Sequence, residues 1–361
     1  MPERVLCIGA SGHIGAAVLD LVKKTYPNLD ITALVRSHAD GKHLEATYTG
    51  VKMIQGSLDD LELIEQEAAA SQLVINCAPD IYTQGITALL KGLSTPSPDS
   101  TSKRFYIHTS GAARVWPPHD VNHPDFTRIW DDLTDLDSFP TDATHAAQDT
   151  LVQSANVSPG VFTAIISPSF VVGKSPSVTH KLPIIFPDLM HVVRQSGGAF
   201  IVDAGENFTT FVDTQELAQL YLLLVKNALE HLLDTNSTPE EEAWGPRAYY
   251  FADSLEVTFK DFMVSHLVPL LKKQTDWIKK NEVTQLSLET VVKSILGRVV
   301  SAAGGEFEGA NIWSRHIAEG FGTAMRISGG RARKYLGWKT DGRVDFEEAV
   351  RALVEEWKAD V

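Results

Sequence analysis

The chain has 361 residues, of which 43% are hydrophobic and 22% charged, and its formal net charge is −14. This composition is typical of a soluble globular protein with a large core, arranged in one large domain or two. The negative charge argues against a nucleic-acid partner, because phosphate binding needs a basic surface. The N-terminus has no apolar signal segment and no apolar run approaches the length of a membrane span. We therefore expect a cytoplasmic protein with no membrane partner.

The most informative feature is a short apolar run followed at once by the spacing Gly-x-x-Gly-x-x-Gly. In such a motif the first glycine makes a tight turn, the second admits a ligand close to the backbone, and the third lets a helix pack on the sheet. A helix predicted from about Ile14 to Thr25 would present free N–H groups and a positive dipole end to a pyrophosphate. The sequence therefore predicts a dinucleotide site at Gly9, Ser11, Gly12, His13, Ile14 and Gly15.

Apolar runs and helical patterns alternate over the first 170 residues. The predicted strands are Arg4–Ile8, Asp30–Val35, Val51–Ile54, Leu73–Cys77, Arg104–Thr109 and Phe162–Ile166, with helical stretches such as Leu58–Ser71 and Asp80–Leu93 between them. Strands rich in Val, Ile and Leu without polar alternation indicate burial on both faces. The sequence therefore predicts an α/β protein with a doubly wound parallel Rossmann sheet. Cys7 and Cys77 fall in these strands and are expected to be buried free thiols.

The alternation ends near Gly173, and a smaller, mostly helical C-terminal substrate lobe is expected there. The patterns in this part predict a strand end and helix over Phe211–Leu232, a strand over Arg247–Ala252, helices over Thr258–Lys273 and Val283–Val300, a basic turn or helix over Arg326–Trp338 and a final helix over Phe346–Trp357. We accordingly assign residues 1–172 to the dinucleotide-binding domain, with 211–252 returning to it. Residues 173–210 and 253–340 form the predicted lobe, and 341–361 the C-terminal helix.

Two segments lack a clear period. Ser94–Ser102 is predicted to be a polar loop, and Trp116–Thr144 a loop rich in Pro and Asp. The aspartates of the second segment are expected to form a solvated face, and no metal site is predicted, because no His or Glu joins them at ligand spacing. These residues are Asp131, Asp132, Asp135, Asp137 and Asp142.

The residues after the second strand indicate which cofactor would bind. A carboxylate at this position accepts hydrogen bonds from ribose hydroxyls and selects NAD, whereas this chain has Arg36 followed by Ser37. A guanidinium pairs well with a 2′-phosphate, so NADP is preferred to NAD. After later strands, Ser57 and Leu58 are placed to touch adenine. Three small residues, Cys77, Ala78 and Pro79, would let the cofactor pass close to the backbone.

At this point the chain resembles the short-chain dehydrogenase/reductase superfamily, and within it the extended and atypical NAD(P)-binding members similar to epimerases, dehydratases and NmrA-like proteins. The segments that carry the resemblance are Gly9–Gly15, Gly56–Asp59, Tyr106–Gly111, Ile165–Ser169 with Val172 and Gly173, Phe211–Asp213 and Arg331–Trp338. They follow the order of the family over most of the chain. The resemblance also implies that Pro168 contacts the cofactor.

The resemblance implies a catalytic Tyr-x-x-x-Lys pair, which this chain lacks at the matching helix. The helix begins near Thr141 and has His145 at the tyrosine position and Asp149 at the lysine position. An imidazole titrates near neutral pH, so His145 with Asp149 one turn later is a candidate acid/base unit, although the pair is also typical of a helix surface. Ser110 is the candidate that orients the substrate, although the family's serine position could instead align to Gly111. Two literal matches, Tyr48/Lys52 and Tyr335/Lys339, lie off this helix and are interpreted as chance.

These observations favour an NADP-dependent reductase of a small hydrophobic metabolite. Its pocket could be lined by aromatic residues of the second lobe, namely Phe170, Phe186, Trp244, Trp277, Trp313 and Phe321, although each of them alone is more typical of a core than of a pocket. A non-catalytic NADP-binding regulator of NmrA type and a redox-neutral isomerase, epimerase or cyclase remain alternatives. The helices near residues 80–93 and 143–153 could pair across the interface of a homodimer, although a monomer is equally consistent with the sequence.

Overall fold

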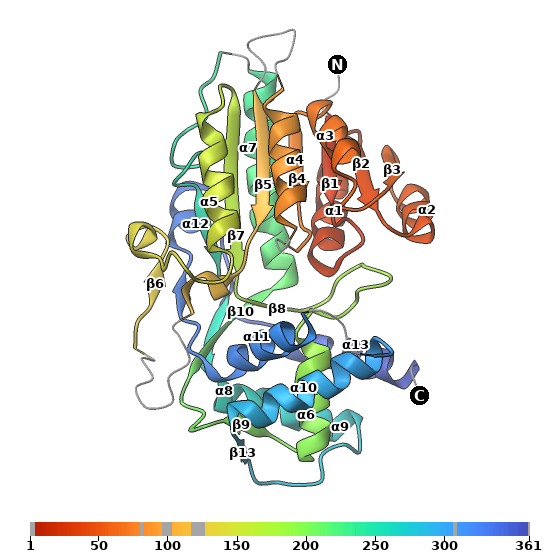
Figure 1. Cartoon of the computed structure of the whole chain (residues 1–361), viewed down its shortest axis with the longest axis vertical. Helices are drawn as coiled ribbons and strands as arrows, with labels where there is room; N and C mark the ends of the chain where they lie inside the picture. The colour runs from red at the N-terminus through yellow and green to blue at the C-terminus, as the bar shows by residue number, and fades with distance from the viewer. Residues whose placement is uncertain are drawn as a thin grey trace.

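In the computed structural model, which describes residues 4–79, 82–95, 103–116, 127–234, 236–305 and 309–359, seven parallel strands form one sheet (Figure 1). Its order is β11-β7-β5-β4-β1-β2-β3. The strands are β1 (Arg4–Ile8), β2 (Asp30–Val35), β3 (Val51–Gln55), β4 (Leu73–Asn76), β5 (Arg104–Thr109), β7 (Val161–Pro168) and β11 (Tyr249–Ala252). The predicted doubly wound parallel sheet is therefore confirmed, with strand ends shifted by at most two residues.

Helices cover both faces of this sheet, which explains why its central strands carry apolar residues on both sides. On one face lie α1 (His13–Thr25) and α7 (Thr214–Leu233), and on the other α3 (Leu61–Ala69), α4 (Thr83–Leu93) and α5 (Ala146–Ser154) (Figure 1). The short helix α2 (His38–Thr47) packs against the edge strand β3. The carboxyl ends of the strands face the second lobe, and this edge is where ligands bind in open α/β sheets.

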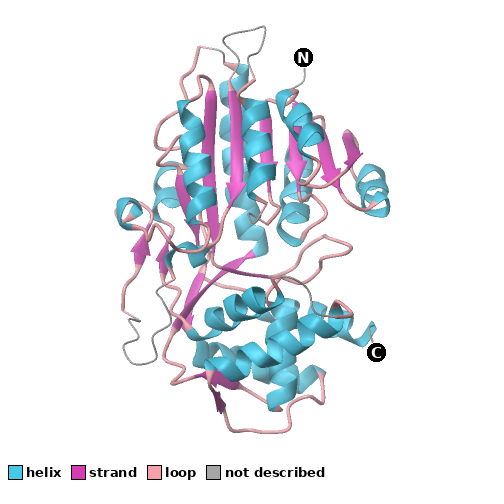
Figure 2. Cartoon of the chain, in the orientation of Figure 1, coloured by secondary structure: helices cyan, strands magenta, loops and turns pink. Residues whose placement is uncertain are grey.

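The second lobe is a helical layer around an aromatic core (Figure 2). Its helices are α6 (Phe186–Ser196), α8 (Phe259–Asp261), a π turn (Phe262–Leu267), α9 (Val268–Gln274), α10 (Leu288–Ala302), α11 (Ala310–Gly322) and α13 (Phe346–Ala359). Its small sheets are β12-β10-β8 (Leu255–Thr258, Phe208–Asp213, Phe170–Val172) and β13-β9 (Thr284–Leu286, Phe200–Val202). No helix within the described residues is long and apolar enough to cross a membrane.

Two details of the lobe differ from the prediction. Residues 284–286 pair with β9 as a strand, and α10 begins only at Leu288, because the Ser287 side chain caps it by accepting a hydrogen bond from the Thr290 N–H. The segment with α12 (Gly330–Tyr335) packs on the large sheet rather than in the lobe, since Ala332 and Trp338 join the core beneath α7. The C-terminal helix α13 packs into the lobe core.

The aspartate-rich segment is not simply the solvated face that was predicted. Its residues 117–126 lie outside the described residues, as do 96–102 of the predicted polar loop. Beyond them, β6 (Trp130–Asp131) pairs with β14 (Ile327–Ser328), and Asp132 is completely buried. The Asp132 carboxylate accepts hydrogen bonds from the N–H groups of Phe251 (2.9 Å) and Arg331 (2.7 Å). This carboxylate therefore joins three segments that are far apart in the sequence.

Candidate functional site

The glycine turn between β1 and α1 has the geometry of a phosphate cradle. Gly9 has a φ of +76°, and a Cβ on it would lie 2.8 Å from the Cys77 carbonyl carbon. A Cβ on Gly15 would lie 2.0 Å from the Gly9 oxygen, so only glycine allows α1 to approach the turn. No side chain caps α1 at Gly12, and its first turn carries no acidic residue. The uncapped N–H groups of this helix therefore fit an anionic group such as a pyrophosphate.

The His13 side chain does not take part in this cradle. Its Nε2 lies 3.0 Å from Thr214 Oγ1, and its Nδ1 lies 3.2 Å from the His180 carbonyl oxygen. Burial lowers the pKa of His13 to about 4, so the ring is neutral at physiological pH. Both ring nitrogens therefore face protein atoms, and the Thr214 hydroxyl itself donates to the Val172 carbonyl (3.1 Å). Any contact of His13 with a cofactor would thus come from its backbone.

A segment leading into the second lobe is hydrogen-bonded to the back of the same turn. Ser177 Oγ donates to the Ser11 carbonyl (2.6 Å), and Ser175 Oγ donates to the His13 carbonyl (2.7 Å). Ile14, by contrast, packs against the apolar core beneath the sheet. The backbone of the glycine turn is therefore held by both lobes.

The predicted adenosine-binding residues lie at the carboxyl ends of β2 and β3. Arg36 is exposed just beyond β2, and among the described residues no carboxylate forms an ion pair with it. The Ser37 hydroxyl caps α2 by accepting from the Asp40 N–H at 3.3 Å. Ser57 hydrogen-bonds Asp60, whereas the Leu58 side chain is 6% exposed and packs in the core. Leu58 thus has little surface to offer an adenine ring.

The residues predicted to border the cofactor lie at the ends of β4 and β7. Cys77 is half-buried, and burial raises the pKa of its thiol to about 12, so the thiol is an inert neighbour at physiological pH. Ala78 donates its N–H to Asn76 Oδ1 (3.1 Å), and Pro79 is exposed beside it. Pro168 ends β7 opposite Ala252. All four stand at the same edge of the sheet as the glycine turn.

The three candidate catalytic residues come from two elements at this edge. Ser110 directly follows β5, and Asp149 lies in α5, whose N-cap is His145 with a left-handed φ of +71°. The His145 imidazole lies over Gly111, since a Cβ there would be 2.8 Å from Nε2. His145 is half-exposed, whereas Asp149 is only 2% exposed. The structure therefore brings the three residues together but places Asp149 beneath the surface.

Asp149 belongs to a buried polar cluster. Its Oδ2 accepts a hydrogen bond from the Tyr249 hydroxyl (3.1 Å) and lies 3.5 Å from Arg114 Nε. Burial raises the pKa of Asp149 to about 6, against the opposing influence of Ser110, His145, Tyr249 and Arg114. No described residue forms a hydrogen bond of regular geometry with Asp149 Oδ1 or with the Ser110 hydroxyl. This carboxyl can therefore gain or lose a proton near neutral pH beside Ser110.

The structure adds residues that the sequence analysis did not identify. Trp116 stacks on His316 of α11 at 5.0 Å between ring centroids, and His316 meets His145 edge-to-face at 6.5 Å. A Cβ on Gly320 would lie 2.8 Å from Trp116, so α11 approaches this ring closely. Only tertiary contacts join α11 to α5, and no local pattern in the sequence indicates them.

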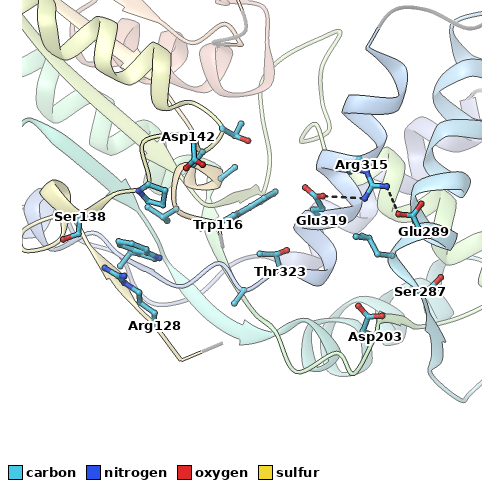
Figure 3. A pocket seen from close by; sticks show the side chains of 18 residues that line it. Trp116, Arg128, Ser138, Asp142, Asp203, Ser287, Glu289, Arg315, Glu319 and Thr323 are labelled. Atoms are coloured by element: carbon cyan, nitrogen blue, oxygen red, sulfur yellow. Dashed lines mark hydrogen bonds and ion pairs between the residues drawn. The ribbon is translucent and has the colours of Figure 1, made fainter. Parts of the chain in front are cut away.

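A pocket of about 1110 Å³ with a mixed polar and apolar lining opens beside Trp116 and Thr144, although neither Ser110 nor His145 lines it (Figure 3). One wall comes from residues 113–116 and 128–144 beside the sheet, and the other from α10, α11 and Asp203 of the lobe. The predicted aromatic lining is wrong. Phe186, Trp244 and Phe321 are each 1% exposed in the two cores, and Trp277 and Trp313 pack against the lobe core. Phe170 packs edge-on against Trp116.

Comparisons with known proteins agree with this geometry. Residues 1–88 match the family model described as the NmrA-like family. The chain is 25% identical over 266 residues to the oxidase ucsJ of Acremonium sp., covering 71% of this chain and 75% of that protein.

Solved structures extend the similarity to the whole chain. The dTDP-glucose 4,6-dehydratase DesIV of Streptomyces venezuelae, solved with NAD, has a TM-score of 0.63 at 16% identity, covering 99% of this chain and 98% of that one. The yeast methylglyoxal/isovaleraldehyde reductase Gre2, solved with NADPH, has a TM-score of 0.58 at 12% identity, covering 99% and 100%. The chain thus has the Rossmann fold of the extended short-chain dehydrogenases/reductases, and its first 88 residues match the NmrA-like family.

Proposed function

We propose that the protein is an NADPH-dependent oxidoreductase that reduces an organic substrate in the pocket between its two lobes. The observation that carries the proposal is the uncapped, glycine-lined N-terminus of α1, with Arg36 at the adjacent strand end. A large pocket is lined by Trp116 and by Thr144, the residue before His145. The relative named as an oxidase supports redox chemistry, and the neighbours solved with NAD and NADPH support a nicotinamide cofactor.

The cofactor, when bound, supplies a hydride to a carbonyl or related unsaturated carbon. The chain must then hold the substrate oxygen and deliver a proton to it. In the proposed arrangement Ser110 donates a hydrogen bond to that oxygen, and the half-exposed imidazole of His145 delivers the proton. Asp149 acts from beneath, since its buried carboxyl lies next to both groups and its pKa is raised to about 6. This division of roles replaces the Tyr-x-x-x-Lys pair.

Replacing Arg36 with alanine should weaken NADPH binding about tenfold, roughly 1.4 kcal/mol, and leave NADH binding within twofold of the wild type. The reason is that only NADPH carries the 2′-phosphate that the guanidinium would bind. Calorimetric titration of both nucleotides measures this. Lys42→Ala, an exposed cation on the neighbouring helix, serves as the control for loss of positive charge. Equal weakening of both nucleotides would contradict the NADP assignment.

Replacing His145 with asparagine should lower kcat at least 100-fold in any reduction found with a panel of carbonyl compounds. Asparagine tolerates the left-handed backbone of position 145, so the fold and the NADPH affinity should be retained. NADPH consumption measures the rate, and His43→Asn on the exposed side of α2 is the matched control. Unchanged turnover would remove His145 from the mechanism.

A regulator that binds NADP without turning it over is a second candidate. It is favoured by one specific observation, namely that the lysine position is occupied by a buried aspartate bonded to Tyr249. Tighter binding of NADP⁺ than of NADPH, together with no consumption of NADPH by the panel, would favour this function. A redox-neutral isomerase, epimerase or cyclase would convert substrate with no net consumption of cofactor.

A further inference from the structure

We propose that the pocket between the lobes takes an organic ammonium ion, a cationic amine with an apolar body. This inference deepens the proposed function, on which it rests for the statement that the pocket holds the substrate.

The charge of the lining is the first support. Four carboxylates from separate segments and two guanidiniums surround the pocket, so the lining has a formal excess of two negative charges. They belong to Asp142, Asp203, Glu289 and Glu319, and to Arg128 and Arg315 (Figure 3). A concave surface of one sign concentrates ligands of the opposite sign.

Both guanidiniums are already engaged by the protein. Arg315 lies 2.6 Å from Glu289 and 3.9 Å from Glu319, so it bridges α10 and α11 within the lining (Figure 3). The guanidinium carbon of Arg128 lies 3.3 Å from the centroid of the Trp130 ring. An anionic ligand would have to compete with Glu289 and Glu319 for Arg315, whereas a cation would be attracted by the net negative charge of the lining. The charge balance therefore favours a cation.

A buried hydroxyl in the lining points to a polar ligand group. Thr323 is 4% exposed, and its Oγ1 has no hydrogen-bond partner among the described residues. It lies between the two charged walls, near Trp116 and Glu319 (Figure 3). Buried polar atoms are generally hydrogen-bonded, and this oxygen can accept a hydrogen bond from an ammonium N–H.

Most of the remaining lining residues are apolar, and the pocket is large enough for a ring system. Val115, Trp116, Trp130, Leu288 and Ala324 line a volume of about 1110 Å³, slightly above the usual range of small-molecule sites. Aromatic faces also attract cations, as Arg128 over Trp130 illustrates within this pocket. The lining is therefore suited to a cationic nitrogen attached to an apolar skeleton.

The test compares two probes with the same ring and opposite charge, tryptamine and indole-3-propionate. Each is titrated into the full-length protein by calorimetry, with and without saturating NADPH. Tryptamine should bind at least tenfold more tightly, and its affinity should fall as NaCl is raised from 50 to 300 mM. Equal binding, tighter binding of the carboxylate, or no binding of either probe would overturn the proposal.

Matched variants assign the effect to the pocket. The double variant Asp142→Asn with Asp203→Asn should weaken tryptamine binding about tenfold. Both changes suit the backbone, since Asp142 is exposed and asparagine accepts the positive φ of position 203. Asp137→Asn, a carboxylate outside the pocket that pairs with Arg247, should leave the affinity unchanged. A double variant that binds tryptamine as tightly as the wild type would refute the proposal.

The two proposals fail separately in this design. If the protein does not bind NADPH, the oxidoreductase proposal is refuted, and the two probes still measure the charge preference of the pocket. Loss of the probe preference with normal NADPH binding would refute only the ammonium ligand.

Discussion

Replacing Gly12 with valine should weaken NADPH binding at least 100-fold, about 2.7 kcal/mol, while the protein remains folded. Gly12 is partly exposed at the N-cap of α1 with φ −74° and ψ 172°, a conformation that valine adopts readily. A Cβ there would meet only the Gly9 oxygen, at 3.2 Å. The added side chain would instead occupy the space through which a pyrophosphate approaches the α1 N–H groups. Calorimetry measures the affinity, and thermal unfolding checks the fold.

Two other glycines serve as controls for this substitution. Gly297→Val, at an exposed position of α10 where no atom lies within 4 Å of a Cβ, should leave NADPH affinity unchanged. Gly15→Val should prevent stable folding, because its Cβ would lie 2.0 Å from a backbone oxygen. A folded Gly12→Val protein with wild-type affinity for NADPH would show that the cofactor does not use this turn.

Replacing Asp132 with alanine should lower the free energy of unfolding by about 2–4 kcal/mol. The change leaves the N–H groups of Phe251 and Arg331 buried without their acceptor. Each such unpaired group costs about 1–3 kcal/mol of folding free energy. Because these N–H groups belong to β11 and α12, the edge of the sheet should loosen first. Urea unfolding followed by tryptophan fluorescence measures the loss. A change below 0.5 kcal/mol would show that the two N–H groups find other partners.

The same carboxyl predicts how stability depends on pH. Burial raises the pKa of Asp132 to about 7 in the folded protein, above its value of about 4 in the unfolded chain. The folded state therefore binds this proton more tightly than the unfolded chain does. The resulting stabilisation of the folded state is fully present below pH 4 and is lost as pH rises through 7. The free energy of unfolding of the wild type should fall between pH 4 and 7, by up to about 1.4 kcal/mol per pH unit. Asp149, with a pKa of about 6, contributes with the same sign.

Asp132→Asn isolates the contribution of Asp132 to this slope. Asparagine has nearly the same shape but no titrating proton, so its unfolding free energy should change less between pH 4 and 7 than that of the wild type. The exposed Asp137→Asn variant should keep the wild-type slope. Identical slopes for the wild type and Asp132→Asn would exclude Asp132 as the source.

The sequence by itself determined the α/β fold class, the six predicted strands and the glycine turn. These features depend on local patterns, because an apolar run, a helical period and a Gly-x-x-Gly-x-x-Gly spacing are each readable within some twenty residues. Leu58 illustrates the limit of such patterns, since its position after β3 was predicted correctly but its side chain packs inward rather than toward a ligand.

Only the tertiary structure decided which polar side chains are buried and what they contact. Asp132 looked like a member of a solvated loop, yet it bonds to residues 119 and 199 positions later in the chain. His13 lies within the glycine motif, but its ring is held by Thr214 and His180. The charged pocket likewise joins residues from both lobes. Such contacts depend on how distant segments pack, and because burial sets both the partner and the pKa of a polar group, no local pattern of residues encodes them.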